Sequence, residues 1–466
     1  MRGAFWTPRG SRLAFGSHLT MRGSSAQNHS TAPPSFREAL AIWGKIGLIN
    51  FGGPAGQIAL MHRILVEEKR WIDETRFLHA LNYCMLLPGP EAMQLAVYVG
   101  WLMHGVRGGL VAGVFFVLPG FFVLLALSTA YVLVGDVPIV AGILFGLKAA
   151  VLAIVAEALL RVSRRALKGP ASVAIAVAAF VAIAFLSVPF PLIVLATAIV
   201  GLSLADRSTP SQAGPDAVSQ HADVLSAHRN PWATSIKAAF VWLTVWFVPV
   251  ALIAFLVGGQ HVFVEVALFF SKVAVVTFGG AYAVLAYVAQ QAVEAHHWLR
   301  PDEMLTGLGL AETTPGPLIL VLVFVGYLAG YRAETGLDPL LAGTIGATVT
   351  LWVTFVPSFL FIFAGAPFVE RLRENRFVAA ALAAVTAAVV GVIANLALWF
   401  GLHVLFAEVA TTELGPVSLP TPDLRGFDWA AAVIALGAAI ALLRFHIGVV
   451  TVLLAAAVAG MALRLL

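Results

Sequence analysis

The sequence has few charges and almost no cysteine. Only 11% of its 466 residues are charged, whereas soluble domains carry about 25%. The single cysteine, Cys84, excludes an intramolecular disulfide and any cysteine-based metal or cluster site. The histidines are scattered, and the adjacent pair His296-His297 points in different directions on a helix, so we expect no metal.

Several function classes are disfavoured by missing motifs. The net charge of +4 comes without a long basic run, so nucleic acid is not an expected partner. The chain has no Gly-rich nucleotide loop and no haem or flavin motif. We therefore expect no cofactor, no enzymatic activity and no ATP-driven pumping by this chain alone.

Apolar residues make up 60% of the chain, and the mean hydropathy is +0.92. Runs of about 20 apolar residues recur, which is long enough for a helix to cross a bilayer. We predict an all-α polytopic integral membrane protein embedded in a lipid bilayer. About 13 segments are expected, at residues 38–61, 77–103, 109–134, 138–160, 171–186, 188–205, 233–257, 261–290, 304–330, 339–364, 377–406, 429–443 and 447–463.

One stretch of the chain occurs twice. A shift of 227 positions aligns residues 45–90 with residues 272–317, and 13 of the 46 aligned positions are identical. The identities include a lysine, a Phe-Gly-Gly and a Pro-Gly-Pro in each copy. We predict a disordered tail at 1–35, a first repeat at 36–205, a polar linker at 206–232, an unpaired helix at 233–260 and a second repeat at 261–466. The tail shows no signal-peptide core, and either Met1 or Met21 could be the start.

The distribution of basic residues predicts an orientation. Loops rich in Lys and Arg prefer the cytoplasm. This places two clusters inside, Arg161, Arg164, Arg165 and Lys168, and Arg371, Arg373 and Arg376. The unpaired helix then inverts the second repeat, a plan found in secondary transporters. The basic loop at 62–76 would lie outside in this count, unless one of the segments beside it is re-entrant.

The repeated motifs break helices inside apolar sequence. Breaks free backbone N–H and C=O groups, which must face protein, water or a ligand. A helix that restarts after Pro-Gly-Pro presents N–H donors and a partial positive charge, which suits an anion. Gln94 can add a donor, and Lys45 and Lys272 can add charge. We predict a small-oxyanion pocket between the repeats, with Glu91, Glu157 and Glu312 as candidate carriers of a coupling proton.

Structural explanations for the same residues remain open. Gly-Gly can serve close helix packing, and Pro-Gly-Pro can simply kink a helix. The two lysines can extend to the membrane interface. Glu157 lies four residues from Arg161, so a local ion pair competes with a proton-carrying role.

At these motifs the sequence resembles the chromate ion transporter family, in its long two-domain form. The matching residues are Phe51 to Gln57, Leu87 to Glu91, Phe278 to Gly280, and Thr314 to Pro317. The resemblance implies proton-driven efflux of chromate across the bacterial inner membrane, with sulfate as a competing look-alike. A passive oxyanion channel and a sulfate transporter are the alternatives, and a homodimer is an open possibility.

Motif chemistry and resemblance together define the predicted binding residues. The two copies differ, because Pro54 and Glu91 correspond to Ala281 and Leu318, so the half-sites are expected to be unequal. The predicted residues are Lys45, Asn50, Phe51, Gly52, Gly53, Pro54, Gln57, Pro88, Gly89, Pro90, Glu91, Gln94, Lys272, Thr277, Phe278, Gly279, Gly280, Glu312, Thr313, Thr314, Pro315, Gly316 and Pro317.

Overall fold

The structure is a computed structural model that describes residues 34–204, 231–278, 280–365, 375–415 and 417–465. Several predictions fall outside these residues. They concern the tail up to residue 33, the linker from 206 to 230, Gly279, and the cluster residues Arg371 and Arg373.

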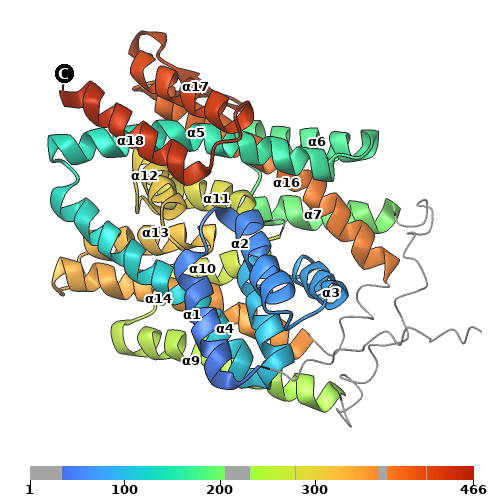
Figure 1. The fold of residues 1–466 in the computed structure, drawn as a ribbon. Coiled ribbons are helices and arrows are strands. Elements are labelled where there is room, and N and C mark those ends of the chain that lie inside the picture. The colour runs from blue at the N-terminus through green and yellow to red at the C-terminus, as the bar shows by residue number, and fades with distance from the viewer. Residues whose placement is uncertain (1–33, 205–230, 279, 366–374, 416, 466) are drawn as a thin grey trace, which may run out of the picture. The chain divides into compact units, whose positions relative to one another are not determined.

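The first half of the chain is helical (Figure 1). Its elements are α1 (Phe36–Ile49), α2 (Gly53–His62), η1 (Arg63–Glu68), α3 (Glu74–Cys84), α4 (Glu91–Val134), α5 (Pro138–Ala166), α6 (Pro170–Leu186) and α7 (Phe190–Leu204). Helix α4 is interrupted at His104 and Gly105, where Gly105 has φ +59°. It therefore consists of two helical pieces.

The second half begins with α9 (Pro231–Val257) and is also mainly helical. It continues with α10 (Val262–Val276), α11 (Ala281–Gln290), η4 (Gln291–Ala295), α12 (Pro301–Glu312), η5 (Leu318–Leu320), α13 (Val321–Arg332), α14 (Pro339–Gly365), α16 (Arg376–Leu405), β1 (Val409–Leu414), β2 (Val417–Pro422), η7 (Leu424–Gly426), α17 (Trp429–Leu443) and α18 (Val449–Leu465).

The element boundaries repeat with the sequence. A shift of 227 residues carries the end of α1 at Ile49 onto the end of α10 at Val276. It carries Glu74, the start of α3, onto Pro301, the start of α12. Both copies also have a π-helical turn after the second helix, η1 in one and η4 in the other. The duplicated sequence therefore folds into the same order of short helices twice.

Burial separates central helices from peripheral ones. Residues 321–330 of α13 are all buried, whereas most of α9 is exposed despite its apolar sequence. Exposed apolar side chains such as Phe240 and Phe255 suit a surface that faces lipid. Among the described helices, α4, α5, α9, α14 and α16 are long and apolar enough to cross a membrane. This agrees with the predicted all-α membrane class, while the count of about 13 spans stays a prediction.

A two-stranded hairpin lies after α16 and was not expected from the sequence. Strands β1 and β2 pair antiparallel, with Val409 opposite Pro422 and Leu414 opposite Val417. The β-branched residues Val409, Thr411, Thr412, Val417 and Thr421 in this segment favour an extended backbone. The hairpin lines a cavity of about 520 Å³ together with Trp399 and His403 of α16.

Glycines allow α18 to pack closely against α5, beside which it runs in Figure 1. A Cβ on Gly146 of α5 would lie 1.9 Å from the Ala456 carbonyl oxygen of α18. A Cβ on Gly460 of α18 would lie 2.4 Å from the Gly142 carbonyl oxygen of α5. Small residues of this kind let two membrane helices approach at backbone distance.

We expect Gly146→Val to lower the free energy of unfolding by about 1–3 kcal/mol, because the added side chain forces α5 and α18 apart. Denaturation of the purified protein in detergent measures this change. Gly437→Ala in α17 is the matched control, because a Cβ there meets nothing within 4 Å. Equal stability of Gly146→Val and wild type would contradict the packing argument.

Candidate functional site

The two repeats are joined by a reciprocal pair of backbone hydrogen bonds. Gly316 N–H donates to the Asn50 carbonyl oxygen at 3.2 Å, and Gly89 N–H donates to the Thr277 carbonyl oxygen at 2.8 Å. These pairs are equivalent, because 89 and 316, and likewise 50 and 277, differ by 227. Each Pro-Gly-Pro therefore bonds to the residue that precedes Phe-Gly-Gly in the other repeat.

Glycine is required at both donor positions. Gly89 has φ +118° and Gly316 has φ +109°, which side-chain-bearing residues rarely adopt. A Cβ on Gly89 would also lie 2.7 Å from Gln94 Nε2, and one on Gly316 would lie 2.7 Å from Leu320 Cδ1. The conformation and the close packing both exclude larger residues.

The long helices α4 and α14 cross this junction. A Cβ on Gly120 of α4 would lie 2.0 Å from the Pro315 carbonyl oxygen of the second repeat. Ser358 of α14 lies near Gly89 of the first repeat, with its Oγ 3.4 Å from the Cβ position of that glycine. Each long helix thus packs on the Pro-Gly-Pro of the other repeat.

Helices begin at the junction with free backbone donors. The N-cap residues of α2, α4 and α11 are Gly52, Pro90 and Gly280, and Pro317 precedes η5 and α13. Glycine and proline have no side-chain oxygen, so they cannot cap the first N–H groups. These helix starts carry partial positive charge, which favours an anion.

The amide side chains of the first repeat are bonded to backbone at this junction. Asn50 Nδ2 donates to the Phe116 carbonyl oxygen at 3.1 Å. Gln57 Nε2 donates to the carbonyl oxygens of Asn50, at 3.0 Å, and Gly316. Gln94 Nε2 donates to the Pro88 carbonyl oxygen at 2.6 Å. The donor expected from Gln94 is therefore used within the protein.

The predicted lysines lie on the surface. Lys45 is exposed on α1, and Lys272 is exposed on α10 with Nζ 5.9 Å from the centre of the Tyr287 ring. Phe51 is 38% exposed. In the described conformation, the positive potential of the junction therefore comes from helix starts, and a binding role for the two lysines stays a prediction.

The hydroxyl groups that precede the second break are also bonded locally. Thr313 and Thr314 both donate to the Leu310 carbonyl oxygen, at 2.8 and 2.7 Å. Thr277 donates to the Val273 carbonyl oxygen at 2.6 Å. These hydroxyls close helix ends in this conformation.

Two of the three predicted carboxylates lie at or beside the breaks. Glu91 Oε1 is 3.8 Å from the Cβ position of Gly280 in the other repeat. Glu312 is buried and accepts a hydrogen bond from the Tyr282 hydroxyl at 2.5 Å. Tyr282 was missed from the sequence, because its counterpart in the first repeat is Ala55 and no repeated pattern marks it.

The third carboxylate forms the local ion pair considered above. Glu157 is bonded to Arg161 within α5. Both of these residues also interact electrostatically with Glu312. Arg161 was expected as part of a cytoplasmic basic cluster and as the ion-pair partner of Glu157, and the structure also brings it within electrostatic range of the buried carboxylate.

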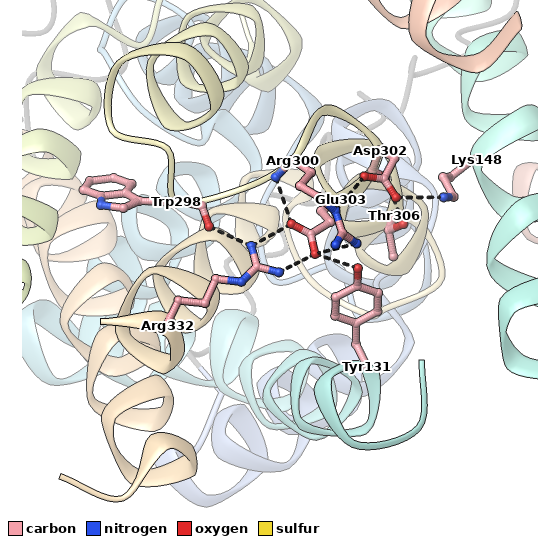
Figure 2. Close-up of polar contacts among 8 residues, drawn as sticks. All are labelled: Tyr131, Lys148, Trp298, Arg300, Asp302, Glu303, Thr306 and Arg332. Atoms are coloured by element: carbon pink, nitrogen blue, oxygen red, sulfur yellow. Dashed lines mark hydrogen bonds and ion pairs between the residues drawn. The ribbon is translucent and has the colours of Figure 1, made fainter. Parts of the chain in front are cut away.

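A second polar cluster lies at the start of α12 (Figure 2). Glu303 has 1% of its side chain exposed and is held by Arg332 of α13, with Nη1 2.7 Å from Oε2. It also accepts from the Tyr131 hydroxyl of α4 at 2.9 Å and from the Arg300 N–H at 2.8 Å. Arg332 donates to the Trp298 carbonyl oxygen as well, at 3.0 Å. This cluster ties α4, α12 and α13 together.

The same cluster continues to α5 at the protein surface. Asp302 pairs with Lys148 of α5 at 3.3 Å and with Arg300 at 3.3 Å. A cavity of about 330 Å³ lies beside these residues and is also lined by Tyr131, Glu303 and Arg464. The sequence reading did not single out Glu303 or Arg332, because they are 29 residues apart and neither lies in a repeated motif.

Burial alone would raise the pKa of Glu303. Hydrogen bonds from the Arg332 guanidinium and the Arg300 N–H outweigh burial, so the pKa of Glu303 lies below its ordinary value. The side chain is therefore held as a carboxylate at neutral pH, and it stabilises the start of α12 as a capping residue.

Comparison with known proteins identifies the family. The chromate transporter family model matches residues 37–202 and 264–461, which covers both repeats. The chain belongs to the chromate transporter family. Membership in this family supports transport of an oxyanion such as chromate across a membrane.

Three curated relatives are similar to the chain over most of its length and of their own. A chromate transport protein of Pseudomonas aeruginosa is 33% identical over 81% of this chain and 84% of its own length. One from Cupriavidus metallidurans is 27% identical over 79% and 84%, and a probable chromate transport protein of Synechococcus elongatus is 27% identical over 86% and 93%. No solved structure shows significant similarity to the chain.

We expect Glu303→Gln to lower the free energy of unfolding by about 1–3 kcal/mol, because it weakens charged hydrogen bonds to Arg332. Asp302→Asn is the matched control next to it. Asp302 is 43% exposed, so its loss should cost less than about 1 kcal/mol. Denaturation in detergent compares the two, and an equal loss would contradict the assignment.

The pH dependence of stability tests the same contact. Because the pKa of Glu303 is depressed in the folded protein, its contribution is present above the unfolded-state pKa and is lost as the pH falls through the folded-state pKa. We expect Glu303→Gln to flatten the acid limb of the stability curve. Superimposable curves for the variant and wild type would contradict this.

Proposed function

We propose that this protein is a secondary active oxyanion transporter. The specific activity we propose is efflux of chromate from the bacterial cytoplasm across the inner membrane. This efflux is driven by the proton gradient, and sulfate competes with chromate for the site. The main support for this proposal is that α2, α4 and α11 all begin, without side-chain caps, at a junction built from both repeats. Family membership supports the choice of an oxyanion.

The substrate contacts we propose are mainly backbone groups. A tetrahedral dianion is attracted by the N–H donors and partial positive charge of helix starts, without needing a buried lysine. This mode of binding agrees with the exposed positions of Lys45 and Lys272.

Proton coupling is assigned to Glu312 and Glu91 in preference to Glu157. Glu157 is already paired with Arg161, whereas Glu312 is buried with Tyr282 as its hydrogen-bond donor. Repulsion between an ionised carboxylate and a nearby dianion makes anion binding depend on protonation. By reciprocity, protonation then depends on anion binding, which is the linkage that coupled transport requires.

We also propose that the short helices form re-entrant hairpins of inverted orientation. In the first repeat, Lys69 in the loop at 62–76 pairs with Glu38 at the start of α1, at 3.0 Å. His104, at the interruption of α4, lies 2.7 Å from the Pro34 carbonyl oxygen. These contacts support a common membrane face for the start of α1, the loop and the interruption.

The second repeat makes contacts of its own at the other end of α4. Trp298 lies beside Phe269 of α10, with ring centres 5.5 Å apart, and its carbonyl oxygen accepts from Arg332 at the end of α13. Tyr131, near the end of α4, bonds to Glu303 there. Because α4 runs from one group to the other, the two loops are proposed to face opposite sides. The basic loop at 62–76 then lies in the cytoplasm, as its charge favours.

Single cysteines test this topology. We expect Glu68→Cys to react with an impermeant thiol reagent from the cytoplasmic side, and Ala295→Cys from the outside. The two positions are exposed and differ by 227, so they are matched across the repeats. Both variants carry Cys84→Ala, which removes the native thiol. Labelling of both positions from one side would refute the inverted arrangement.

Transport is tested with everted membrane vesicles made acid inside. We expect labelled chromate to accumulate, a protonophore to abolish the accumulation, and unlabelled sulfate to compete. Downhill flux that ignores the protonophore would indicate a passive channel instead. No chromate flux in either direction would overturn the proposed substrate.

The coupling residue is tested in the same vesicles. Glu312→Gln should lose proton-driven accumulation and retain downhill flux, because it removes the titrating group and keeps the shape. Glu334→Gln, at an exposed position in the loop after α13, is the control and should accumulate chromate as wild type does. Normal accumulation by Glu312→Gln would remove Glu312 from the coupling mechanism.

A further inference from the structure

Gln57 has a side-chain oxygen that is buried and unsatisfied. The residue is 0% exposed, and its Nε2 donates to the carbonyl oxygens of Asn50 and Gly316. Turning the amide over would place its oxygen against two other oxygens, so the assignment is determined by the contacts. Oε1 therefore faces away from them, and no described protein group donates to it.

Asn50 has the same feature in the same junction. It is 0% exposed, and its Nδ2 donates to the Phe116 carbonyl oxygen at 3.1 Å, which determines the orientation of this amide as well. Its Oδ1 also receives no hydrogen bond from the described protein groups. Gln94 Oε1, at the same junction, is a third buried acceptor to which no described protein group donates. Such acceptors are costly unless something positive or protic meets them.

These oxygens cannot bind the oxyanion, because both are acceptors. They require a cation or a hydrogen-bond donor. The C-terminal end of α1 lies directly before Asn50, and helix C-termini carry partial negative charge that favours a cation. Half-helix ends and unwound carbonyl groups coordinate Na⁺ in other transporter folds.

The second repeat does not reproduce this arrangement. Thr277 stands at the position of Asn50, and its hydroxyl is bonded to the Val273 carbonyl oxygen. Val284 stands at the position of Gln57. At these equivalent positions the unsatisfied amide oxygens thus belong to the first repeat, which argues against a general requirement of the fold.

We infer that the junction of Asn50, Gln57 and Gly316 holds a monovalent cation, with Na⁺ as the matching ion. The ligands are the side-chain oxygens of Asn50 and Gln57. Both are neutral, whereas Ca²⁺ and Mg²⁺ sites rely on carboxylates. The site lies beside the helix starts assigned to the oxyanion, so its cation would offset the negative charge of the substrate.

Binding of ²²Na⁺ to the purified full-length protein in detergent tests the site, without oxyanion and without a gradient. We expect saturable binding in wild type. It should weaken about tenfold or more in Asn50→Thr and Gln57→Val, which lose a ligand of a charged group. These substitutions introduce the residues found at the equivalent positions of the second repeat. Thr348→Val is the control and should bind ²²Na⁺ as wild type does, because Thr348 is exposed on α14 and its hydroxyl bonds within that helix, to the Thr344 carbonyl oxygen.

The unfolding temperature of the wild-type protein tests Na⁺ binding without any variant. At constant ionic strength, Na⁺ should raise the unfolding temperature of wild type above its value in choline, because a ligand that binds the folded state stabilises it. Absence of both saturable binding and a Na⁺-specific shift would mean that only water meets these oxygens, and the inference would fall. Unchanged binding in Gln57→Val would overturn it as well.

The result is independent of the transport assay. Na⁺ binding with no chromate transport would retain the cation site and refute the proposed function. Chromate transport with no Na⁺ binding would support the proposed function and refute the cation site.

Discussion

Buried backbone groups that lose their helical partners must find others, and in this protein two of them find partners in the opposite repeat. The N–H of each Pro-Gly-Pro glycine bonds to the carbonyl group that precedes the other Phe-Gly-Gly. An unpaired group would cost several kcal/mol in hydrocarbon, so neither repeat can form its breaks alone at low cost. The remaining features of the centre depend on this exchange, including the helix starts and the close approach of α4 to Pro315.

The backbone hydrogen bonds between the two repeats are symmetric, whereas the side chains around them differ between the repeats. The first repeat contributes Asn50 and Gln57, whose side-chain amides bond to the backbone of the junction. The second contributes Glu312 with Tyr282, and at a distance the cluster of Glu303 and Arg332. In the proposed transport function, the unequal side chains would give the two repeats different roles in binding and coupling.

The repeated Phe-Gly-Gly and Pro-Gly-Pro allowed the junction to be anticipated, because residues retained together in two copies share a structural demand. The ion pair of Glu157 with Arg161 was also foreseeable, since the residues are one helical turn apart. The exposed positions of Lys45 and Lys272 were not, because an apolar neighbourhood in sequence is the same for a residue that faces lipid, interface or pocket. The positions equivalent to Tyr282 and Arg332 in the first repeat hold Ala55 and Gly105, so duplication could not mark these side chains.

By itself the sequence determined the membrane class, the duplication and the sites of helix interruption, since these follow from apolar content and from backbone freedom at glycine and proline. Only the tertiary structure decided which Pro-Gly-Pro bonds to which Phe-Gly-Gly segment. The acceptor of a freed N–H group can lie more than two hundred residues away in the chain. The tertiary structure also decided how each amide is turned. That choice depends on the carbonyl oxygens around the side chain, and no local pattern in the chain records them.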